Sequence, residues 1–256
     1  MRVLVTRPQP QADEWVARLQ AAGVDACALP LIHIGAPADD GAVAAAWQTL
    51  AGHALVMFVS PNAGTRFFER RPAGMAWPAG VWAGATGPGT AAALRACGVP
   101  QDCVVEPQAS AGVFDSEALW TRIAAWRDWR GACVLVVRGE GGRDWLAQTL
   151  QQQGAEVHFV EAYRRLPPQL DEAQQARLQR ALAEPSAHVW WFSSSEAIGY
   201  LEQLAPRARW SPACAVASHP RIAARAQAAG FGRVLQAGPA LHELLRALAS
   251  IQSPAP

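Results

Sequence analysis

The sequence predicts an α/β protein built from two doubly wound parallel-sheet domains, and three observations support this prediction. The chain repeats itself, because residues 3–23 align without a gap with residues 134–154. Short apolar segments alternate with segments of helical periodicity, the pattern of β-α-β units in parallel sheets. The length of 256 residues is too great for one comfortable core and suits two domains of ordinary size.

The first repeated unit reads as strand, helix and strand. Residues 3–6 are rich in β-branched side chains, and residues 11–22 carry apolar side chains at helical spacing before Gly23, which ends the helix. Residues 24–34 predict a second extended strand, broken at Pro30. The same order of elements recurs over residues 133–166.

A second repeated unit, made of two strand–helix pairs, follows each copy of the first. Its expected strands are residues 54–59 and 81–85 in the first copy, and 188–192 and 214–217 in the second. Helices are expected after Pro61, Pro88, Ser195 and Pro220. The order along the chain is therefore A, B, A′, B′. The pattern leaves open whether A shares a sheet with B or with B′.

Composition and charge limit the classes of function. With 51% apolar residues, 17% charged residues and a formal net charge of +1, the chain predicts a globular protein that binds neither membranes nor nucleic acid. Its five cysteines form no Cys-x-x-Cys pair, so neither a disulfide framework nor a zinc site is indicated. The first strand begins too early for a secretory signal, and we expect a cytoplasmic protein.

The strand-to-helix loops are the candidate site, because ligands of doubly wound sheets bind beyond the carboxyl ends of the strands. Six small, hydroxylated or glycine-rich loops are expected, at residues 6–10, 60–63, 86–90, 138–143, 193–196 and 218–221. Their hydroxyl and amide side chains could simply cap helices. Four arginines in the same loops favour binding of carboxylates or phosphates at the helix N-termini: Arg7, Arg138, Arg143 and Arg221.

Other kinds of site find little support. The chain has no GxxxxGK[ST] segment, no Gly-x-Gly-x-x-Gly after the first strand and no Gly-x-Ser-x-Gly, so we expect neither a nucleotide cofactor nor a covalent hydrolase. The tryptophans, including Trp82 and Trp126, are interpreted as core and interface residues. Four scattered histidines lack metal-ligand spacing and are interpreted as structural or solvated: His33, His53, His158 and His242.

Several loop motifs, in this order and at this spacing, resemble the uroporphyrinogen-III synthase family over nearly the whole chain. They are Arg-Pro at 7–8, Ser-Pro-Asn-Ala at 60–63, Gly-Pro at 87–88, Val-x-Arg-Gly-Glu-Gly-Gly-Arg at 136–143, Val-Glu-x-Tyr at 160–163 and Ser-Ser-Glu-Ala at 194–197. The resemblance implies a crossed chain, with residues 1–35 plus 168–256 in one domain and residues 36–167 in the other. Two extended connections and an active-site cleft between the domains are implied.

The implied activity is closure of linear hydroxymethylbilane to uroporphyrinogen III, with inversion of ring D and loss of water through a spiro intermediate. This step belongs to haem or sirohaem biosynthesis and uses no cofactor. Hydroxymethylbilane synthase supplies the substrate, so functional coupling to that enzyme is expected. We expect a monomer, since the repeat already supplies two lobes.

The resemblance also implies roles for particular residues. Tyr163 matches a family tyrosine suggested as the proton donor to the leaving hydroxyl, although its position at a strand end also suits a packed aromatic residue. The expected substrate-binding residues are Ser60, Asn62, Thr86, Gly139, Ser194 and Ser195, with Arg7, Arg138 and Arg221 as electrostatic partners. Residues 218–221 lack a threonine found in some family members, and His219 or Arg221 is the expected substitute.

Two alternatives remain open. A cytoplasmic two-domain binding or sensor protein would close on an anionic small molecule and leave it unchanged. A flavodoxin-like redox module would retain flavin, although nothing in the loops demands one.

Overall fold

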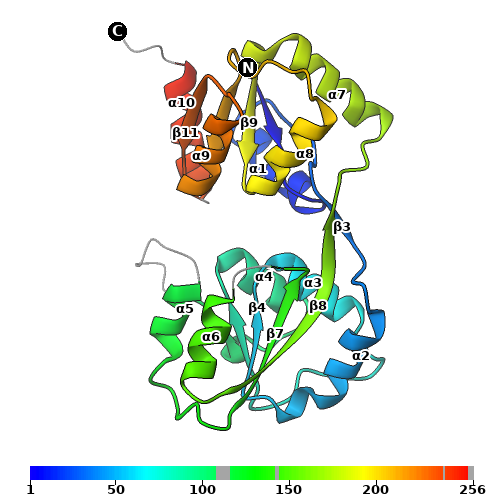
Figure 1. The fold of residues 1–256 in the computed structure, drawn as a ribbon, viewed down its shortest axis with the longest axis vertical. Helices are drawn as coiled ribbons and strands as arrows, with labels where there is room; N and C mark the ends of the chain where they lie inside the picture. The colour runs from blue at the N-terminus through cyan, green and yellow to red at the C-terminus, as the bar shows by residue number, and fades with distance from the viewer. Residues whose placement is uncertain (108–115, 142–143, 239, 253–256) are drawn as a thin grey trace. The chain divides into compact units, whose positions relative to one another are not determined.

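The computed structural model describes residues 1–107, 116–141, 144–238 and 240–252. Its contacts divide the chain into two compact units. Unit 1 consists of Met1–Ile34 and Leu166–Pro256, and unit 2 is the continuous segment Gly35–Arg165. The chain therefore crosses between the units twice, within the extended strands β3 (His33–Gly35) and β8 (Glu156–Leu166) (Figure 1). These crossings lie inside the two segments expected to be extended.

Unit 1 contains a five-stranded sheet in the order β11-β10-β9-β1-β2, with every neighbouring pair parallel. Its strands are β1 (Arg2–Val5), β2 (Ala26–Ala28), β9 (His188–Phe192), β10 (Cys214–Ala217) and β11 (Arg233–Gln236). Its α-helices are α1 (Gln11–Ala21), α7 (Glu172–Ala183), α8 (Ser195–Leu204), α9 (Pro220–Ala228) and α10 (Leu241–Gln252).

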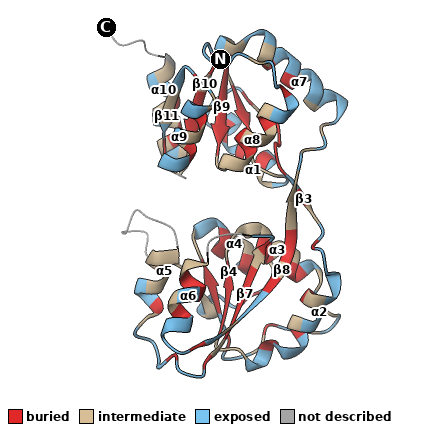
Figure 2. Cartoon of the chain, viewed as in Figure 1, coloured by how far each residue is buried: buried red, intermediate tan, exposed pale blue. Residues whose placement is uncertain are grey.

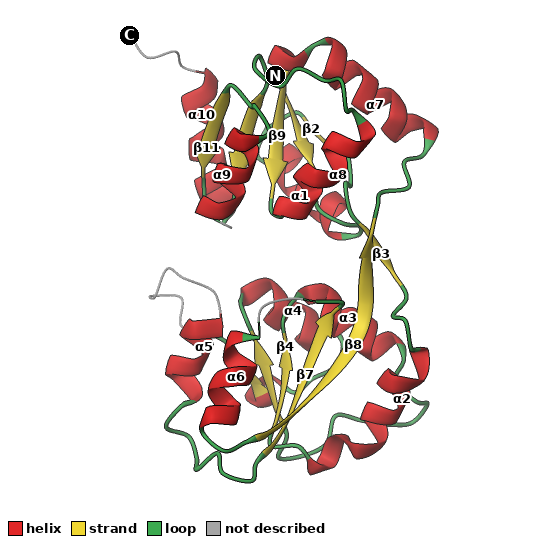
Figure 3. Ribbon diagram, in the orientation of Figure 1, coloured by secondary structure: helices red, strands yellow, loops and turns green. Residues whose placement is uncertain are grey.

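Unit 2 is organised around a six-stranded sheet in the order β3-β8-β7-β4-β5-β6. Besides β3 and β8, its strands are β4 (Leu55–Phe58), β5 (Trp82–Ala85), β6 (Val104–Val105) and β7 (Cys133–Gly139). Its α-helices are α2 (Asp40–Thr49), α3 (Pro61–Glu69), α4 (Pro88–Ala96), α5 (Ser116–Ile123) and α6 (Trp145–Gln152). Figure 3 shows strands alternating with helices in both units.

The internal repeat is reproduced in the register of the sheets. In unit 1 Val3 lies opposite Val189, and in unit 2 their counterparts Val134 and Leu55 lie opposite each other. The first β-α-β segment thus shares its sheet with the last repeated unit, while β4 and β7 pair in the other sheet. This answers the question that the sequence pattern left open.

The predicted strand over residues 24–34 is divided between the two sheets. β2 belongs to unit 1 and β3 to the sheet of unit 2. Pro30 lies between them and has no N–H to continue a ladder. The backbone N–H groups of Leu29 and Leu31 still donate to Val5 and Thr6, so the chain leaves the first sheet only after Leu31.

The cores lie on both faces of each sheet, as parallel sheets require. Figure 2 shows buried residues along the strands in both units. In unit 1 the consecutive residues Trp190, Trp191 and Phe192 are all fully buried. Trp190 packs with Trp210 and Phe231 on one face, while Trp191 packs edge-on against Trp15 on the other.

The interpretation of Trp82 and Trp126 as core residues is wrong. Their exposed fractions are 40% and 41%. Trp82 opens β5 at the amino end of the strand, and Trp126 lies just after α5, so neither is enclosed by the helices. The two rings cover each other instead, with centroids 4.9 Å apart.

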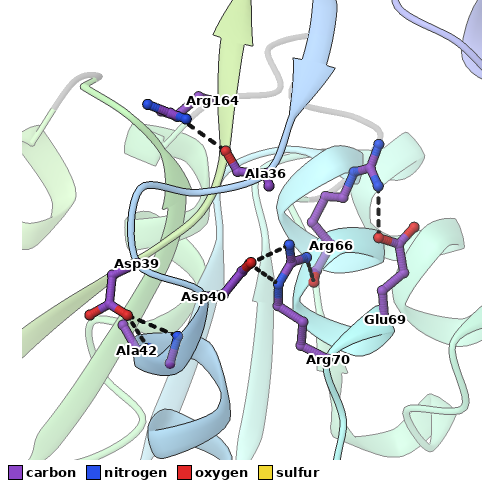
Figure 4. A network of polar contacts seen from close by, with 9 residues as sticks. Ala36, Asp39, Asp40, Ala42, Arg66, Glu69, Arg70 and Arg164 are labelled. Atoms are coloured by element: carbon purple, nitrogen blue, oxygen red, sulfur yellow. Dashed lines mark hydrogen bonds and ion pairs between the residues drawn. The ribbon is translucent and has the colours of Figure 1, made fainter.

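Polar contacts fasten the extended strand β8 within unit 2. Arg164 donates from Nε to the carbonyl oxygen of Ala36, which follows β3 (Figure 4). Close by, Arg70 at the end of α3 forms an ion pair with Asp40 in the first turn of α2.

Among the described residues, no helix is both long and apolar enough to cross a bilayer.

Candidate functional site

Four of the predicted site residues gather at the carboxyl end of the unit 2 sheet. Tyr163 lies in β8, Gly139 ends β7, Ser60 follows β4 and Thr86 follows β5. These strands are consecutive neighbours in the sheet. Gly139 and Tyr163 are register partners across an irregularity in the ladder. The topology therefore brings together residues that are far apart in the sequence.

The hydroxyl of Tyr163 joins two other polar side chains. It lies 3.1 Å from Ser60 Oγ, and Arg165 donates to it from Nη2 at 3.1 Å. The Arg165 guanidinium also lies 5.5 Å from the centroid of the tyrosine ring. Since Arg165 already donates to the phenol oxygen, the single phenol proton is available to Ser60 or to another acceptor.

Tyr163 is nevertheless a buried residue, with an exposed fraction of 1%. The alternative interpretation, a packed strand-end aromatic residue, therefore describes its ring correctly. Its hydroxyl contacts Ser60, a residue that is only half-buried. The packing and the polar contacts of this tyrosine are compatible with each other.

Gly139 leaves room for the tyrosine ring. A Cβ atom placed on Gly139 would lie 2.6 Å from Cζ of Tyr163 and 3.0 Å from its hydroxyl oxygen. Any side chain at this position would displace the ring. A backbone hydrogen bond also joins the two strands here, because the N–H of Glu140 donates to the carbonyl oxygen of Tyr163. Gly139 thus contributes to the site through its lack of a side chain.

Of the hydroxylated loops of unit 2, the one at Ser60 caps a helix through its side chain. Ser60 is the N-cap of α3 and accepts from the N–H of Ala63 at 3.1 Å. Thr86 donates to the carbonyl oxygen of Val59, and Asn62 lies in the first turn of α3. For Ser60 capping and contact with Tyr163 coexist, since its oxygen carries two lone pairs.

Arg138 does not join this group. Its guanidinium forms an ion pair with Asp144 and lies 4.4 Å from the ring centroid of Phe159. A carboxylate of the protein therefore already neutralises the charge that we expected to meet a ligand. Two residues of the same predicted loop, Gly142 and Arg143, lie outside the described residues.

In unit 1 the loop after β1 presents a poorly compensated cation. The guanidinium carbon of Arg7 lies 5.3 Å from the Trp15 ring and 5.1 Å from the Trp191 ring. Its Nε is buried and has no hydrogen-bond partner among the described residues. Burial, and to a smaller degree the positive charge of Arg18, lowers the pKa of Arg7 to about 10. Because this buried nitrogen has no partner among the described residues, the guanidinium is suited to bind an anionic ligand.

Two further loops of unit 1 begin helices with capping side chains. Ser194 caps α8 by accepting from the N–H of Glu196, and Ser195 is the first helical residue. His219 caps α9, because its Nδ1 accepts from the backbone N–H of Arg221 at 3.1 Å. With Nδ1 as acceptor, the neutral ring carries its proton on Nε2 and presents a donor to solvent. Arg221 itself is exposed.

The carboxyl end of each sheet can therefore bind carboxylates. The helix dipoles place partial positive charge at these ends, and the capping hydroxyls, Arg7 and Arg221 supply donors and full positive charge. Arg165, which donates to the Tyr163 hydroxyl, is a residue of the candidate site that sequence reasoning missed. Its spacing two residues after Tyr163 on a strand puts both side chains on one face, and that spacing was the available signal.

Comparisons with known proteins identify the family of this chain. The family model of uroporphyrinogen-III synthase HemD matches residues 13–245. The uroporphyrinogen-III synthase of Salmonella typhimurium is 32% identical over 182 residues, covering 69% of this chain and 70% of that protein. The Escherichia coli uroporphyrinogen-III synthase is 30% identical over 178 residues, with the same coverage of 69% and 70%.

Solved structures show the same fold. A mutant uroporphyrinogen III synthase of Thermus thermophilus matches with a TM-score of 0.60 at 19% identity, over 98% of each chain. The uroporphyrinogen-III synthetase of Helicobacter pylori matches with a TM-score of 0.58 at 15% identity, also over 98% of each chain. From the family model and the curated relatives together, the chain belongs to the uroporphyrinogen-III synthase family.

Proposed function

We propose that this protein cyclises hydroxymethylbilane to uroporphyrinogen III, as a lyase that eliminates water in tetrapyrrole biosynthesis. Membership of the family supports the activity. The observation that supports the site is the hydrogen-bonded group of Tyr163, Ser60 and Arg165 beside Gly139. A buried phenol that meets both a cation and a half-buried hydroxyl is suited to proton donation.

The loops of both units are proposed to hold one substrate. Hydroxymethylbilane carries eight carboxylates, and the helices α3, α4, α8 and α9 each begin shortly after a strand, where the positive end of the helix dipole favours an anion. Thr86, Asn62, Ser194, Ser195 and His219 would donate to individual carboxylates. Arg7 and Arg221 would supply compensating charge, whereas the ion pair with Asp144 makes Arg138 the weakest member of the set.

Catalysis is proposed to start with departure of the hydroxymethyl oxygen. Tyr163 gives its proton to that oxygen, directly or through Ser60, and the carbon–oxygen bond breaks to form water and an azafulvene electrophile. The substituted carbon of the terminal pyrrole attacks to form the spiro intermediate. This intermediate reopens and recloses with the ring inverted, and the proton lost from the ring carbon restores the tyrosine.

Orientation supplies the selectivity. The bilane can also close without inversion, so the protein has to favour the harder geometry by holding several carboxylates at once. Such catalysis depends on binding the transition state better than the extended substrate. We therefore propose that loops of both units act on a single substrate molecule. We also propose that the enzyme is monomeric and cytoplasmic, and that hydroxymethylbilane synthase supplies its substrate.

The test is a coupled assay. Hydroxymethylbilane synthase makes the bilane in situ, with and without this protein, and the porphyrin isomers are separated by chromatography after oxidation. We expect the main product to be isomer I without this protein and isomer III when the protein is present. Isomer I alone, from protein whose circular dichroism shows it to be folded, would reject the synthase and favour a binding or sensor protein for an anionic molecule.

A further inference from the structure

At the amino end of the unit 2 sheet, three residues with metal-binding side chains lie together. Cys133 begins β7, Glu156 begins β8 and His158 follows two residues later. Their potential ligand atoms all lie within 4.8 Å of one another, and Cys133 Sγ is 3.8 Å from a carboxylate oxygen of Glu156. We propose that these residues bind a zinc ion together with His53, at a site separate from the Tyr163 group.

His53 lies beside this group and is the proposed fourth ligand. It precedes β4, the other neighbour of β7, and the N–H of the adjacent Ala54 donates to the carbonyl oxygen of Cys133 at 2.8 Å. The His53 and His158 rings are 6.1 Å apart and nearly perpendicular. His53 Nδ1 lies 3.1 Å from the carbonyl oxygen of Thr49.

The contact with Thr49 prepares His53 for coordination. A carbonyl oxygen only accepts, so Nδ1 carries the proton and Nε2 keeps its lone pair for a metal. Donation of one ring N–H to a backbone carbonyl is the usual support of a metal-binding histidine, because it fixes both the tautomer and the ring orientation. The interpretation of His53 and His158 as merely structural or solvated is replaced by this proposal.

The internal repeat provides a comparison for the site. The residues of unit 1 that correspond to Cys133 and Glu156 are Arg2 and Asp25, which form an ion pair at 3.0 Å. In both units the second position is a carboxylate. Unit 2 has a thiol where unit 1 has the guanidinium, and no cationic side chain pairs with Glu156 among the described ion pairs of unit 2. A bound cation would replace the missing charge.

The ligand set matches zinc chemistry. Zinc binds sulfur, nitrogen and oxygen in tetrahedral sites at about 2.0–2.3 Å, which places ligand atoms about 3.3–3.8 Å apart. Glu156 and His158 are exposed, so their side chains can close the remaining difference by rotation. Binding converts the Cys133 thiol to a thiolate and releases its proton. One thiolate and one carboxylate then balance the two charges of the ion.

Cobalt(II) gives a direct test, because it takes zinc sites and reports a thiolate ligand through a charge-transfer band. The full-length protein, purified without metal, is titrated with cobalt and then with zinc. We expect tetrahedral cobalt absorption with a thiolate band, abolished by one equivalent of zinc. Cys133→Ser should remove the thiolate band, whereas Cys103→Ser, which changes another half-buried cysteine of unit 2, should keep it.

A second measurement protects the test against misfolded variants. His53→Ala should fold normally and bind zinc on the order of 10- to 100-fold more weakly, the loss typical of even outer partners of metal sites. His33→Ala is its matched control and should bind zinc as the wild type does. Zinc should raise the melting temperature of the wild type more than that of His53→Ala. A cobalt spectrum without a thiolate band, or zinc affinity unchanged in His53→Ala, would overturn the proposal.

Discussion

At the scale of single residues, Tyr163 combines a buried ring with a hydroxyl that meets Ser60 and Arg165. Tyr163→Phe removes only the hydroxyl, so we expect the fold to persist and turnover to fall by about 10²–10⁴-fold, the usual contribution of a positioned acid. Tyr200→Phe is the matched control, because Tyr200 is the other tyrosine and its hydroxyl contacts Glu196. Equal rates for both variants would remove Tyr163 from the mechanism.

Gly139 is predicted to tolerate no side chain. Gly139→Ala brings Cβ to 2.6 Å from Tyr163 Cζ, so the ring has to move away from Ser60. Overpacking of this kind costs about 1–3 kcal/mol of unfolding free energy, and we expect turnover to fall with it. Gly199→Ala, in open space on helix α8, should instead gain about 0.5–1 kcal/mol. Urea unfolding and the isomer assay on both variants make the comparison.

We predict that Arg7 lowers the unfolding free energy of the protein and strengthens substrate binding. Because burial lowers its pKa to about 10, the folded protein pays for keeping it charged at neutral pH. Arg7→Met should therefore raise the unfolding free energy by about 1–3 kcal/mol, since one pKa unit corresponds to about 1.4 kcal/mol. The same change should raise KM by on the order of tenfold, the worth of a charged hydrogen bond to a carboxylate.

The pH dependence of this effect has a definite sign. With a lowered pKa in the folded state, Arg7 loses its proton at a lower pH when folded than when unfolded, so its penalty is complete at neutral pH and fades as the pH rises through 10. The stability difference between wild type and Arg7→Met should narrow accordingly. Arg18→Met, which removes an exposed arginine over the same Trp15 ring, should show a smaller narrowing, because the charge of Arg18 is the lesser cause of the lowered pKa of Arg7.

The sequence identified most residues of the candidate site but not their partners. The expected loops contained Ser60 and Gly139, because the carboxyl ends of parallel strands meet at one edge, and the family resemblance assigned roles to these two residues and to Tyr163 at a strand end. The ion pair of Arg138 with Asp144 was hidden, since it depends on side-chain direction within the loop. The proximity of His53 and His158 was hidden for a similar reason, because they lie far apart in sequence and their rings come within 6.1 Å only through strand pairing.

At the scale of elements, a short strand followed by a capping residue and a proline was the pattern that best predicted the start of a helix. Ser60-Pro61, Gly87-Pro88 and His219-Pro220 each start a helix where the sequence predicted one. Helix α7 was not singled out, although Asp171 and Gln174 form a capping box at its start.

Helix α9 tests whether histidine serves as a cap. His219→Ala removes the acceptor for the N–H of Arg221, and we expect a loss of about 1 kcal/mol in unfolding free energy. His219→Ser restores a hydroxyl acceptor and should recover that loss. If His219 also replaces a substrate-binding hydroxyl, serine should preserve KM while alanine raises it. Stability restored by serine with KM still raised would restrict the substrate contact to the imidazole Nε2.

At the scale of the whole molecule, the repeat and the folded units do not coincide. Each sheet combines one copy of the β-α-β segment with one copy of the second unit, and the partners are crossed. Sequence periodicity predicted both segments but could not pair them, since the copies are alike and pairing depends on contacts between distant strands.

This arrangement predicts which fragment of the protein folds alone. Residues 33–166 contain every strand of the six-stranded sheet, so we expect this fragment to unfold cooperatively and to give the far-ultraviolet circular dichroism of an α/β domain. Residues 1–131, a cut at the sequence repeat, separate β1 from β9 and β4 from β7 and should not fold. In the isomer assay the folded fragment should yield only isomer I, because it keeps Tyr163 but lacks Arg7, Ser194 and His219. Formation of isomer III by residues 33–166 would restrict the active site to unit 2, and an unfolded fragment would mean that unit 2 depends on contacts with unit 1.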